Sequence, residues 1–221
     1  MKLFLDSANI NDLEFALDLG FIKGVTTNPS LLSKEPKSNF NEHIKNMVKI
    51  LKDHKSSLPL SVEVFTNDPD KMIEQAKEIY DLAEYEHLNI KIPVGWRELK
   101  AISVISEFTK VNVTCIFNVQ QSIIAAGAGG HYLSIFFGRL KDIGGYPIDV
   151  ITETKKILKE FNSNCEIIAG SIRNQGDVLE SISSGADIVT TSLEVLESLT
   201  PHPQTDKSVN GFLKDFESWI S

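Results

Sequence analysis

The chain has 221 residues, of which 42% are hydrophobic and 24% are charged, a composition typical of one globular domain with a large core. Its formal net charge of −8 disfavours nucleic acids and anionic membranes as partners, although a local basic cluster could still bind a small anion. No apolar stretch approaches membrane-spanning length and Asp6 comes too early for a signal peptide, so we expect a cytoplasmic protein with small-molecule ligands.

Eight short segments rich in strand-forming residues alternate with segments of helical period. The expected strands are Lys2–Asp6, Gly24–Thr27, Leu60–Phe65, Asn89–Ile92, Val111–Phe117, His131–Phe136, Cys165–Gly170 and Asp187–Thr191. The expected helices are Asn9–Leu19, Phe40–Lys52, Asp68–Ala83, Arg97–Phe108, Asn118–Ala126, Pro147–Phe161, Asn174–Ser183 and Ser192–Leu199. Eight such units without a linker predict one domain over residues 1–221, an α/β fold that is a closed (β/α)8 TIM barrel rather than an open doubly wound sheet.

An additional C-terminal helix is expected over residues 205–220. Pro201 and Pro203 interrupt the chain, and Thr205-Asp206 can cap the helix. Its apolar residues recur at helical spacing: Val209, Phe212, Leu213, Phe216 and Ile220. This stripe needs a surface to cover, with its own barrel as the default expectation and a neighbouring subunit as the alternative.

The sequence gives no indication of a metal or redox site. Cys115 and Cys165 lie in apolar runs without paired spacing, so we expect reduced core thiols. The five histidines are scattered and form no ligand pair. Gly127–Gly130 matches no full nucleotide-binding fingerprint and is interpreted as a helix stop before the sixth strand. We therefore expect neither a metal nor a cofactor.

Lys91 lies between Ile90 and Ile92 in a strand that is expected to be buried on both faces. A buried ammonium group costs free energy unless it is paired, and a lowered pKa that leaves a neutral, nucleophilic amine costs less. Such an amine is what Schiff-base chemistry requires. The alternative is a lysine on an edge strand that reaches water along its aliphatic stem.

Polar residues repeatedly occupy the same face of successive strands. In a parallel barrel side chains alternate between the interior and the helix layer, and active sites gather at the carboxyl ends of the strands. The polar face carries Asp6, Thr26, Asn28, Ser61, Glu63, Asn89, Lys91, Asn112, Thr114, Ser134 and Phe136, whereas the other carries Val25, Val62, Val64, Ile90, Ile92 and Val113. The polar set is therefore expected to converge on one cavity suited to covalent carbonyl chemistry.

Each polar residue also has a purely structural interpretation. Asp6 could simply end a strand, and Asn28 could begin a helix. Glu63 could do no more than neutralise the lysine. Asn112 and Thr114 could be core polar groups with satisfied hydrogen bonds. Taken together, the set favours a functional site.

Basic and hydroxyl side chains follow the sixth and seventh strands. Arg139 follows the sixth, and Ser171 and Arg173 follow the seventh. Loops at this end of a barrel commonly bind phosphate through arginine forks, hydroxyls and backbone N–H groups. The alternative is that the arginines are ordinary surface residues.

Segments from nearly the whole chain resemble the transaldolase family, and within it the short subfamily that also contains the fructose-6-phosphate aldolases. The matching segments are Phe4–Asn9, Gly24–Ser30, Ser61–Glu63, Ile90–Pro93, Asn112–Thr114, Phe137–Arg139, Gly170–Arg173, Gly185–Asp187, His202-Pro203 and Thr205–Lys207. The resemblance implies a cofactor-free enzyme of the pentose phosphate pathway that moves a dihydroxyacetone unit from a ketose phosphate to an aldose phosphate. It also implies a homo-oligomer, a pentamer or decamer, with the terminal helix packed on a neighbour.

The resemblance also implies roles for individual residues. The implied catalytic set is Lys91 as the Schiff-base lysine, Asp6 as the acid/base carboxylate, and Glu63 with Thr114 as the pair that positions a catalytic water. The implied substrate-binding set is Thr26, Asn28, Asn112, Ser134 and Phe136, with Arg139, Ser171 and Arg173 as the phosphate site.

Three positions separate the two activities of the subfamily. The aldolases resemble one another in having glutamine at the position of Glu63 and tyrosine at that of Phe136, and they lack the asparagine found here as Asn112. All three favour a transaldolase. An aldolase is the nearest alternative, and a non-catalytic sugar-phosphate-binding barrel is a more distant one.

The chain departs from the subfamily pattern near the expected site. Ile135 replaces a usual proline, Lys141 replaces a usual aspartate, and Gly95-Trp96 replaces a usual hydroxyl-bearing turn. These departures bear on substrate fit and rate more than on the type of reaction.

Overall fold

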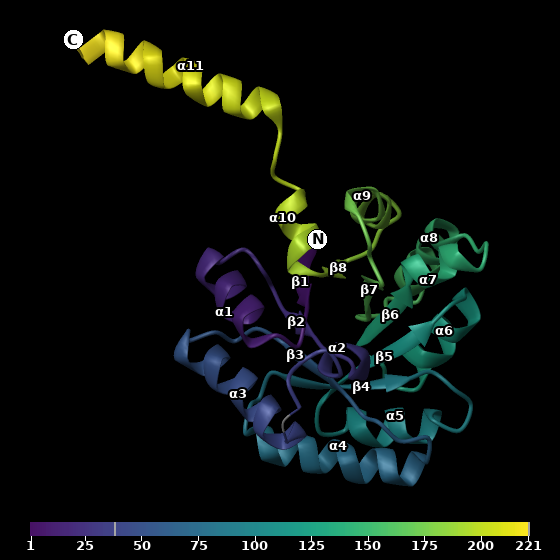
Figure 1. Cartoon of the computed structure of the whole chain (residues 1–221). Helices are drawn as coiled ribbons and strands as arrows, with labels where there is room; N and C mark the ends of the chain where they lie inside the picture. The colour runs from purple at the N-terminus through teal and green to yellow at the C-terminus, as the bar shows by residue number, and fades with distance from the viewer. Residues whose placement is uncertain (38, 221) are drawn as a thin grey trace.

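The computed structural model describes residues 1–37 and 39–220, and its strands form a closed parallel barrel in sequence order (Figure 1). The strands are β1 (Lys2–Asp6), β2 (Val25–Thr26), β3 (Leu60–Glu63), β4 (Leu88–Pro93), β5 (Lys110–Ile116), β6 (Tyr132–Phe136), β7 (Glu166–Gly170) and β8 (Ile188–Thr191). Each strand pairs with the next, and β8 closes the ring on β1. The predicted (β/α)8 barrel is confirmed.

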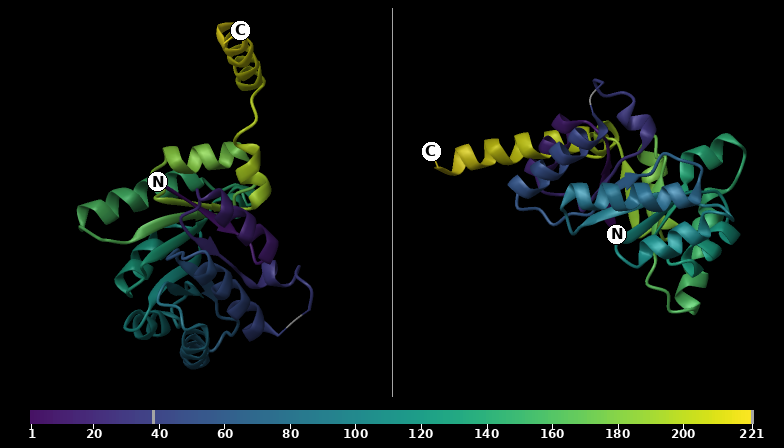
Figure 2. Two further views of the ribbon diagram at one scale, coloured as in Figure 1. Left: turned by 90° about the vertical axis from the view of Figure 1, so that its left-hand side faces the viewer. Right: turned by 90° about the horizontal axis from the view of Figure 1, so that it is seen from below.

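Helices follow the strands and form the outer layer of the barrel (Figure 2). They are α1 (Ile10–Leu19), α2 (Pro29–Leu32), α3 (Phe40–Asp53), α4 (Pro69–Ala83), α5 (Leu99–Ser106), α6 (Val119–Gly127), α7 (Phe137–Asp142), α8 (Pro147–Glu160), α9 (Gln175–Ser183), α10 (Leu193–Ser198) and α11 (Pro203–Ile220). Several expected helix starts are N-caps: Asn9 accepts hydrogen bonds from two amides of α1, and Asp68 does the same for α4.

Two short helices, α2 and α7, are additions to the expected pattern. They have four and six residues and follow β2 and β6 directly. Both begin directly after a strand and have at most two turns, so their helical period does not stand out from the strand pattern before them. Both lie at the carboxyl ends of strands, where they can shape a cavity.

The alternation of side chains divides the molecule into an outer core and a barrel interior. Val62, Ile90, Ile92 and Val113 are fully buried in the main apolar core, together with side chains of the surrounding helices. The barrel interior has its own small apolar layer, made by Phe4, Tyr132, Ile168 and Ile188. We call these four residues the lower layer. Each lies at least two residues before the last inward-facing position of its strand. The carboxyl ends of the strands are therefore left for polar groups.

Strand β5 interrupts the strict alternation. Its register with β6 shifts between Val113 and Ile116, and Cys115 has a left-handed φ of 59°. A bulge of this kind turns a side chain away from the face that alternation assigns to it.

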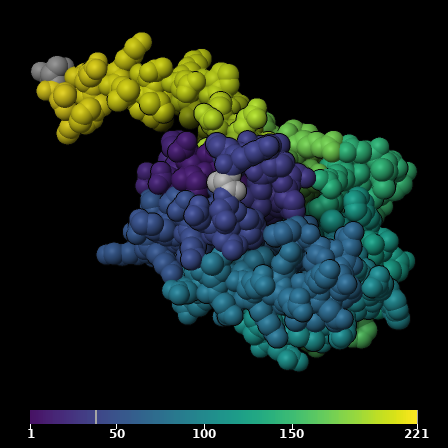
Figure 3. Space-filling model, turned by 60° about the horizontal axis from the view of Figure 1, so that its bottom comes forward, coloured from purple at the N-terminus to yellow at the C-terminus, as the bar shows by residue number. Residues whose placement is uncertain are grey.

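Helix α11 stands clear of the barrel (Figures 1 and 3). None of its residues is buried, and its apolar residues are exposed: Val209, Phe212, Leu213, Phe216, Trp219 and Ile220. The helix begins at Pro203 rather than at residue 205, because proline is well suited to a first helical position. The default expectation that it folds back on its own barrel is therefore wrong for the described chain. None of the described helices is both long and apolar enough to cross a membrane.

Candidate active site

A cavity of about 370 Å³ opens at the carboxyl ends of the strands. Most of the residues that the sequence assigns to a site line it: Asp6, Thr26, Asn28, Glu63, Lys91, Ser134, Phe136, Arg139 and Ser171. They come from strands on opposite sides of the barrel and from the loops that follow them. The expected convergence on one cavity is therefore present in the fold.

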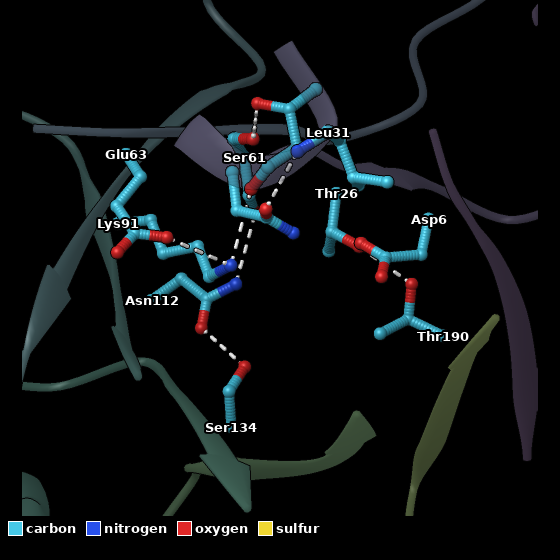
Figure 4. Close-up of polar contacts among 11 residues, drawn as sticks. Asp6, Thr26, Leu31, Ser61, Glu63, Lys91, Asn112, Ser134 and Thr190 are labelled. Atoms are coloured by element: carbon cyan, nitrogen blue, oxygen red, sulfur yellow. Dashed lines mark hydrogen bonds and ion pairs between the residues drawn. The ribbon is translucent and has the colours of Figure 1, made fainter. Parts of the chain in front are cut away.

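Lys91 occupies the centre of this constellation (Figure 4). It is 5% exposed, and its Nζ lies 3.1 Å from Glu63 Oε2 and donates to the Thr27 carbonyl oxygen at 3.1 Å. Glu63 and Lys91 are direct neighbours in the pairing of β3 with β4, so their side chains share one face. A closed barrel has no edge strand at this position, which excludes the alternative of an edge lysine.

Asp6 lies across the cavity at the end of β1. Its Oδ1 accepts a hydrogen bond of 2.7 Å from Thr26 Oγ1, which is 2.6 Å from Thr190 Oγ1. Because a hydroxyl carries one proton, Thr190 donates to Thr26 when Thr26 donates to Asp6. Burial raises the pKa of the Asp6 carboxyl above its ordinary value, and the positive charge of Lys91 is the largest effect that opposes this. The result is a carboxyl that holds its proton more readily than an exposed aspartate.

Asn112 connects three strands beneath the cavity. Its Nδ2 donates to Ser61 Oγ at 3.1 Å, and its Oδ1 accepts from Ser134 Oγ at 2.6 Å (Figure 4). Asn112 is fully buried and does not line the cavity itself, whereas Ser134 does. The amide thus orients the serine hydroxyl, and it is a satisfied core group as well as a neighbour of Lys91 in the strand pairing.

The bulge in β5 changes which side chain reaches the cavity from this strand. Cys115 lines the cavity wall, which corrects its expected place among the core thiols. Burial raises the pKa of its thiol, and the nearby Glu63 carboxylate adds to this effect. Thr114 is fully buried, and its hydroxyl lies beside the thiol without a well-formed hydrogen bond to any described residue. A buried hydroxyl in this condition calls for a further hydrogen-bond partner.

Asn28 combines the two interpretations open to it. Its Oδ1 accepts a hydrogen bond of 3.0 Å from Leu31 N and so caps α2, with Pro29 at the first helical position. The same residue lines the cavity, because α2 lies over the carboxyl end of β2. Capping fixes the side chain at the mouth of the site.

Arg139 and Ser171 form the basic end of the cavity. Arg139 is on α7, and its guanidinium lies 4.7 Å from the centre of the Phe136 ring. Ser171 has a left-handed φ of 59°, and its carbonyl accepts a hydrogen bond from Gly138 N at 3.2 Å. A Cβ at Gly138 would collide with that carbonyl, so only glycine permits α7 to approach the β7 loop this closely.

Arg173, like the buried Asn112 and Thr114, is a predicted site residue outside the cavity wall. It does not line the cavity; its guanidinium forms a bidentate ion pair with Asp142 of α7. About half of the Arg173 side chain is exposed to solvent. The structure therefore brings one of the two predicted arginines to the cavity and holds the other at its border.

Among the other residues that line the cavity, Lys34, Cys115 and Thr190 carry reactive or polar side chains that the sequence did not assign to the site. Thr190 shares the inward parity of β8 and could have been found by extending the strand alternation to that strand. Lys34 follows helix α2, of which the sequence suggested only the start at Asn28, and its charge opposes the raised pKa of Asp6. Cys115 depends on the bulge, which no periodic pattern signals. Within the described ranges, no group of three or more His, Cys, Asp or Glu side chains is arranged to hold a metal ion.

A closed parallel barrel that encloses one lysine, with two carboxylates beside it and cations at the rim, defines a lysine-centred (β/α)8-barrel enzyme. The family described as transaldolase/fructose-6-phosphate aldolase matches residues 3–220. The chain belongs to this family.

Several relatives match the chain over nearly its whole length. A protein of Caldicellulosiruptor saccharolyticus named "Probable transaldolase" is 43% identical and covers 98% of this chain and 97% of its own. Proteins with the same name from Oceanobacillus iheyensis and Thermoplasma volcanium are 41% and 40% identical, over 99% and 98% of this chain and 99% and 96% of their own.

A solved structure supports the fold alone. Thiamine phosphate pyrophosphorylase from Pyrococcus furiosus superposes with a TM-score of 0.61 at 10% identity, and covers 86% of this chain and 85% of its own. Identity this low carries no argument about activity.

Proposed function

We propose that the protein is a transaldolase that transfers a dihydroxyacetone unit between sugar phosphates by Schiff-base chemistry. The donor is a ketose phosphate, sedoheptulose 7-phosphate or fructose 6-phosphate, and the acceptor is an aldose phosphate, glyceraldehyde 3-phosphate or erythrose 4-phosphate. The proposal includes a role in the pentose phosphate pathway and a cytoplasmic location. One observation carries the proposal. The buried amine of Lys91 contacts Glu63 and lines the same cavity as Asp6.

Lys91 begins the reaction by attacking the C2 carbonyl carbon of the donor. The amine must first lose a proton, and the Glu63 carboxylate at 3.1 Å is the acceptor in contact with it. The carbinolamine that forms then loses water to give an iminium ion. Its positive nitrogen withdraws electrons from the carbon chain, which prepares the C3–C4 bond for cleavage.

Asp6 is the base and then the acid of the carbon–carbon step. It takes the proton of the C4 hydroxyl as the C3–C4 bond breaks, and an aldose phosphate leaves while the dihydroxyacetone unit remains on Lys91 as an enamine. When the acceptor aldehyde adds, Asp6 returns the proton to the new hydroxyl. A carboxyl whose pKa is raised by burial suits both roles, because it takes up a proton more readily than an ordinary aspartate and can return it.

Water releases the product from Lys91. Glu63 and Thr114 are the residues proposed to position that water, and the buried Thr114 hydroxyl without a well-formed hydrogen bond to a described residue supports this role. Cys115 forms part of the same wall. Asn28 and Ser134 lie where substrate hydroxyls would approach, and Asn112 acts on them through Ser134.

Phe136 and Glu63 favour transfer over simple aldol cleavage. The Phe136 ring is held between the Phe117 ring at 5.7 Å and the Arg139 guanidinium, and it offers no proton donor to the water that would release free dihydroxyacetone. Asn112, with its two hydrogen bonds to serines, is the third position that distinguishes the chain from the aldolases. These features support slow hydrolysis of the enamine relative to its capture by an acceptor.

Reduction with borohydride in the presence of fructose 6-phosphate tests the covalent step. The expected result is a dihydroxyacetone adduct on Lys91, located by peptide mass spectrometry. An unmodified protein that still binds the sugar phosphate would instead indicate a binding barrel without chemistry. Turnover measured with and without erythrose 4-phosphate then separates the two enzymes: a transaldolase requires the acceptor, whereas an aldolase releases dihydroxyacetone without it.

The assembly proposed for this enzyme is a pentamer or decamer in which α11 covers a neighbouring subunit. The exposed apolar stripe of α11, with Phe212 70% exposed, supports this because a single subunit leaves the stripe in water. Light scattering coupled to size exclusion is the measurement. A chain ending at Thr200 is expected to give smaller particles, and unchanged particles would contradict the role of α11.

A further inference from the structure

Arg173, assigned above to the phosphate site, is held by a carboxylate of its own chain. Its Nη1 donates to Asp142 Oδ1 at 2.5 Å, and its Nη2 donates to Asp142 Oδ2. This fork-to-fork geometry is the one that an arginine also uses to bind a phosphate group. The Asp142 carboxylate therefore occupies the two terminal nitrogens to which a substrate phosphate would have to bind.

The remaining nitrogen of Arg173 is close to the backbone of α7. A Cβ placed on Gly138 would lie 3.1 Å from Arg173 Nε, so this edge of the guanidinium faces the start of the helix. Helix α7 therefore covers both hydrogen-bonding edges of the Arg173 guanidinium: its backbone at Gly138 lies at the Nε edge, and Asp142 binds Nη1 and Nη2. Arg173 cannot bind a phosphate bidentately without releasing Asp142.

Asp142 acts on both arginines of the proposed phosphate site. The Arg173 guanidinium lowers the pKa of the Asp142 carboxyl, and the charge of Arg139 adds to this effect. Arg139 lines the cavity itself. A single negative charge is therefore in electrostatic range of the two cations that are assigned to a dianionic ligand.

The elements that carry the pair are tied together by a second set of contacts. Lys141, next to Asp142 on α7, lies 2.8 Å from Asp177 Oδ1 and 2.6 Å from Glu180 Oε2 on α9. The other oxygen of Asp177 accepts a hydrogen bond of 3.1 Å from Arg173 N. Lys141 thus fixes α7 against the backbone of the loop that carries Arg173, which keeps Asp142 opposite the guanidinium.

We propose that Asp142 is an affinity-determining residue that competes with the substrate phosphate for Arg173. The phosphate displaces the carboxylate from the guanidinium fork when the sugar binds, and the carboxylate takes the fork back when the product leaves. The competition weakens binding of every phosphorylated ligand and favours release of the product. This inference rests on the proposed function for the identity of the sugar, but the competition itself concerns any phosphate group.

Titration with inorganic phosphate, followed by phosphorus NMR, tests the competition without requiring catalysis. The variant Asp142→Asn keeps the size of the side chain and removes its charge. We expect it to bind phosphate roughly three- to tenfold more tightly than the native protein, because one repulsive charge near a dianion is lost. Asp53→Asn is the matched control, since Asp53 is also an exposed, ion-paired carboxylate on a helix but lies at the end of α3 that leads into β3, on the opposite face of the barrel.

The variant Arg173→Met tests whether the competition acts through this arginine. We expect it to weaken phosphate binding and to reduce the effect of adding Asp142→Asn. Equal or weaker phosphate binding by Asp142→Asn alone would overturn the inference, because the carboxylate would then be neutral toward the ligand or would orient the arginine for it. A full effect of Asp142→Asn in the Arg173→Met background would overturn the assignment of the exchange to Arg173.

The borohydride experiment separates this inference from the proposed function. A Lys91 adduct together with unchanged phosphate binding in Asp142→Asn would reject the competition and leave the transaldolase proposal intact. Tighter phosphate binding without an adduct would reject the chemistry and leave the competition intact. For the active enzyme, the KM of fructose 6-phosphate should fall in Asp142→Asn, with no gain for unphosphorylated fructose.

Discussion

The lower and upper halves of the barrel interior are made by the same strands, yet they have opposite chemistry. Phe4 lies below Asp6 on β1, Tyr132 below Ser134 on β6, and Ile188 below Thr190 on β8, and the lower residue of each pair belongs to the apolar layer. Two residues of translation along a strand separate a packed core from a polar cavity. The lower half of the barrel interior therefore contributes to stability and the upper half to chemistry. Substitutions can perturb each half on its own.

The largest effect is expected from Lys91→Met, which removes the nucleophile from the upper half. Transfer of dihydroxyacetone should fall at least about 10⁴-fold, because the variant removes the enclosed amine that forms the iminium ion, and Lys34, the other lysine that lines the cavity, is exposed to solvent. The variant leaves Glu63 without its cation, so circular dichroism and thermal unfolding must show that the barrel persists. Turnover that survives in a folded variant would contradict the proposed chemistry.

Asp6→Asn is expected to come next, with a loss of about 10²- to 10⁴-fold in kcat. The amide keeps a hydrogen-bonding group next to Thr26 but cannot exchange a proton with the substrate. The KM should change less than kcat, since the interaction that is lost acts during bond cleavage. Thr190→Val, which alters only the hydroxyl behind Thr26, is the matched comparison and should lose far less activity.

Asp6→Asn should also change how the free energy of unfolding depends on pH. Because burial raises the pKa of Asp6 in the folded state, the folded protein binds more protons than the unfolded chain at a pH above the ordinary value of 3.8. The native protein then loses stability as pH rises through this window, whereas Asp6→Asn does not. Urea unfolding from pH 4 to pH 7 should show the variant gaining stability relative to the native protein, and a constant difference would contradict the raised pKa.

Phe4→Ala addresses the lower half and should reduce the free energy of unfolding by about 3–5 kcal/mol. The ring is almost fully buried among Tyr132, Ile168 and Ile188, and nothing in the cavity replaces it. Urea unfolding gives the loss of stability, and the fraction of Lys91 that can be trapped by borohydride gives the active-site content of the protein that remains folded. If the fraction of Lys91 that is trapped falls further than the fraction of protein that is folded, the two halves are coupled.

Lys141→Ala is expected to have the smallest effect, a roughly two- to fivefold fall in the KM of fructose 6-phosphate with kcat unchanged, because α7 then holds Asp142 less firmly against Arg173. The lysine is partly exposed, but it contacts the buried carboxylate of Asp177 and so holds α7 against α9. Lys100→Ala, which breaks another exposed ion pair, with Asp70, is the control. Equal effects of the two variants would show that Lys141 has no particular connection to the phosphate site.

Strand alternation predicted the upper half well because the barrel repeats it with little variation. Asp6, Lys91 and Ser134 all lie where parity and the carboxyl-end rule place them. The enclosure of Lys91 also followed from its isoleucine neighbours, since a closed barrel buries both faces of β4. Local rules were enough where each residue follows the regular geometry of its own strand.

The sequence was less informative where the geometry depends on a contact between distant elements. Cys115 reaches the cavity through a bulge that the two-residue period does not contain. Arg173 lies at the border because Asp142, on the six-residue helix α7, binds it from 31 residues away. Asn28 had two interpretations, and the structure combines them because one oxygen can cap a helix at the rim of a cavity.

The helical content of α11 is expected to depend on the protein concentration as well as on the sequence. An isolated helix of 18 residues is only marginally stable in water, and α11 gains no burial from its own barrel. In the proposed oligomer the exposed Phe216 and Trp219 rings would leave solvent, so the helicity of α11 should rise with protein concentration. Dilution would then lower the ellipticity near 222 nm before the barrel itself begins to unfold.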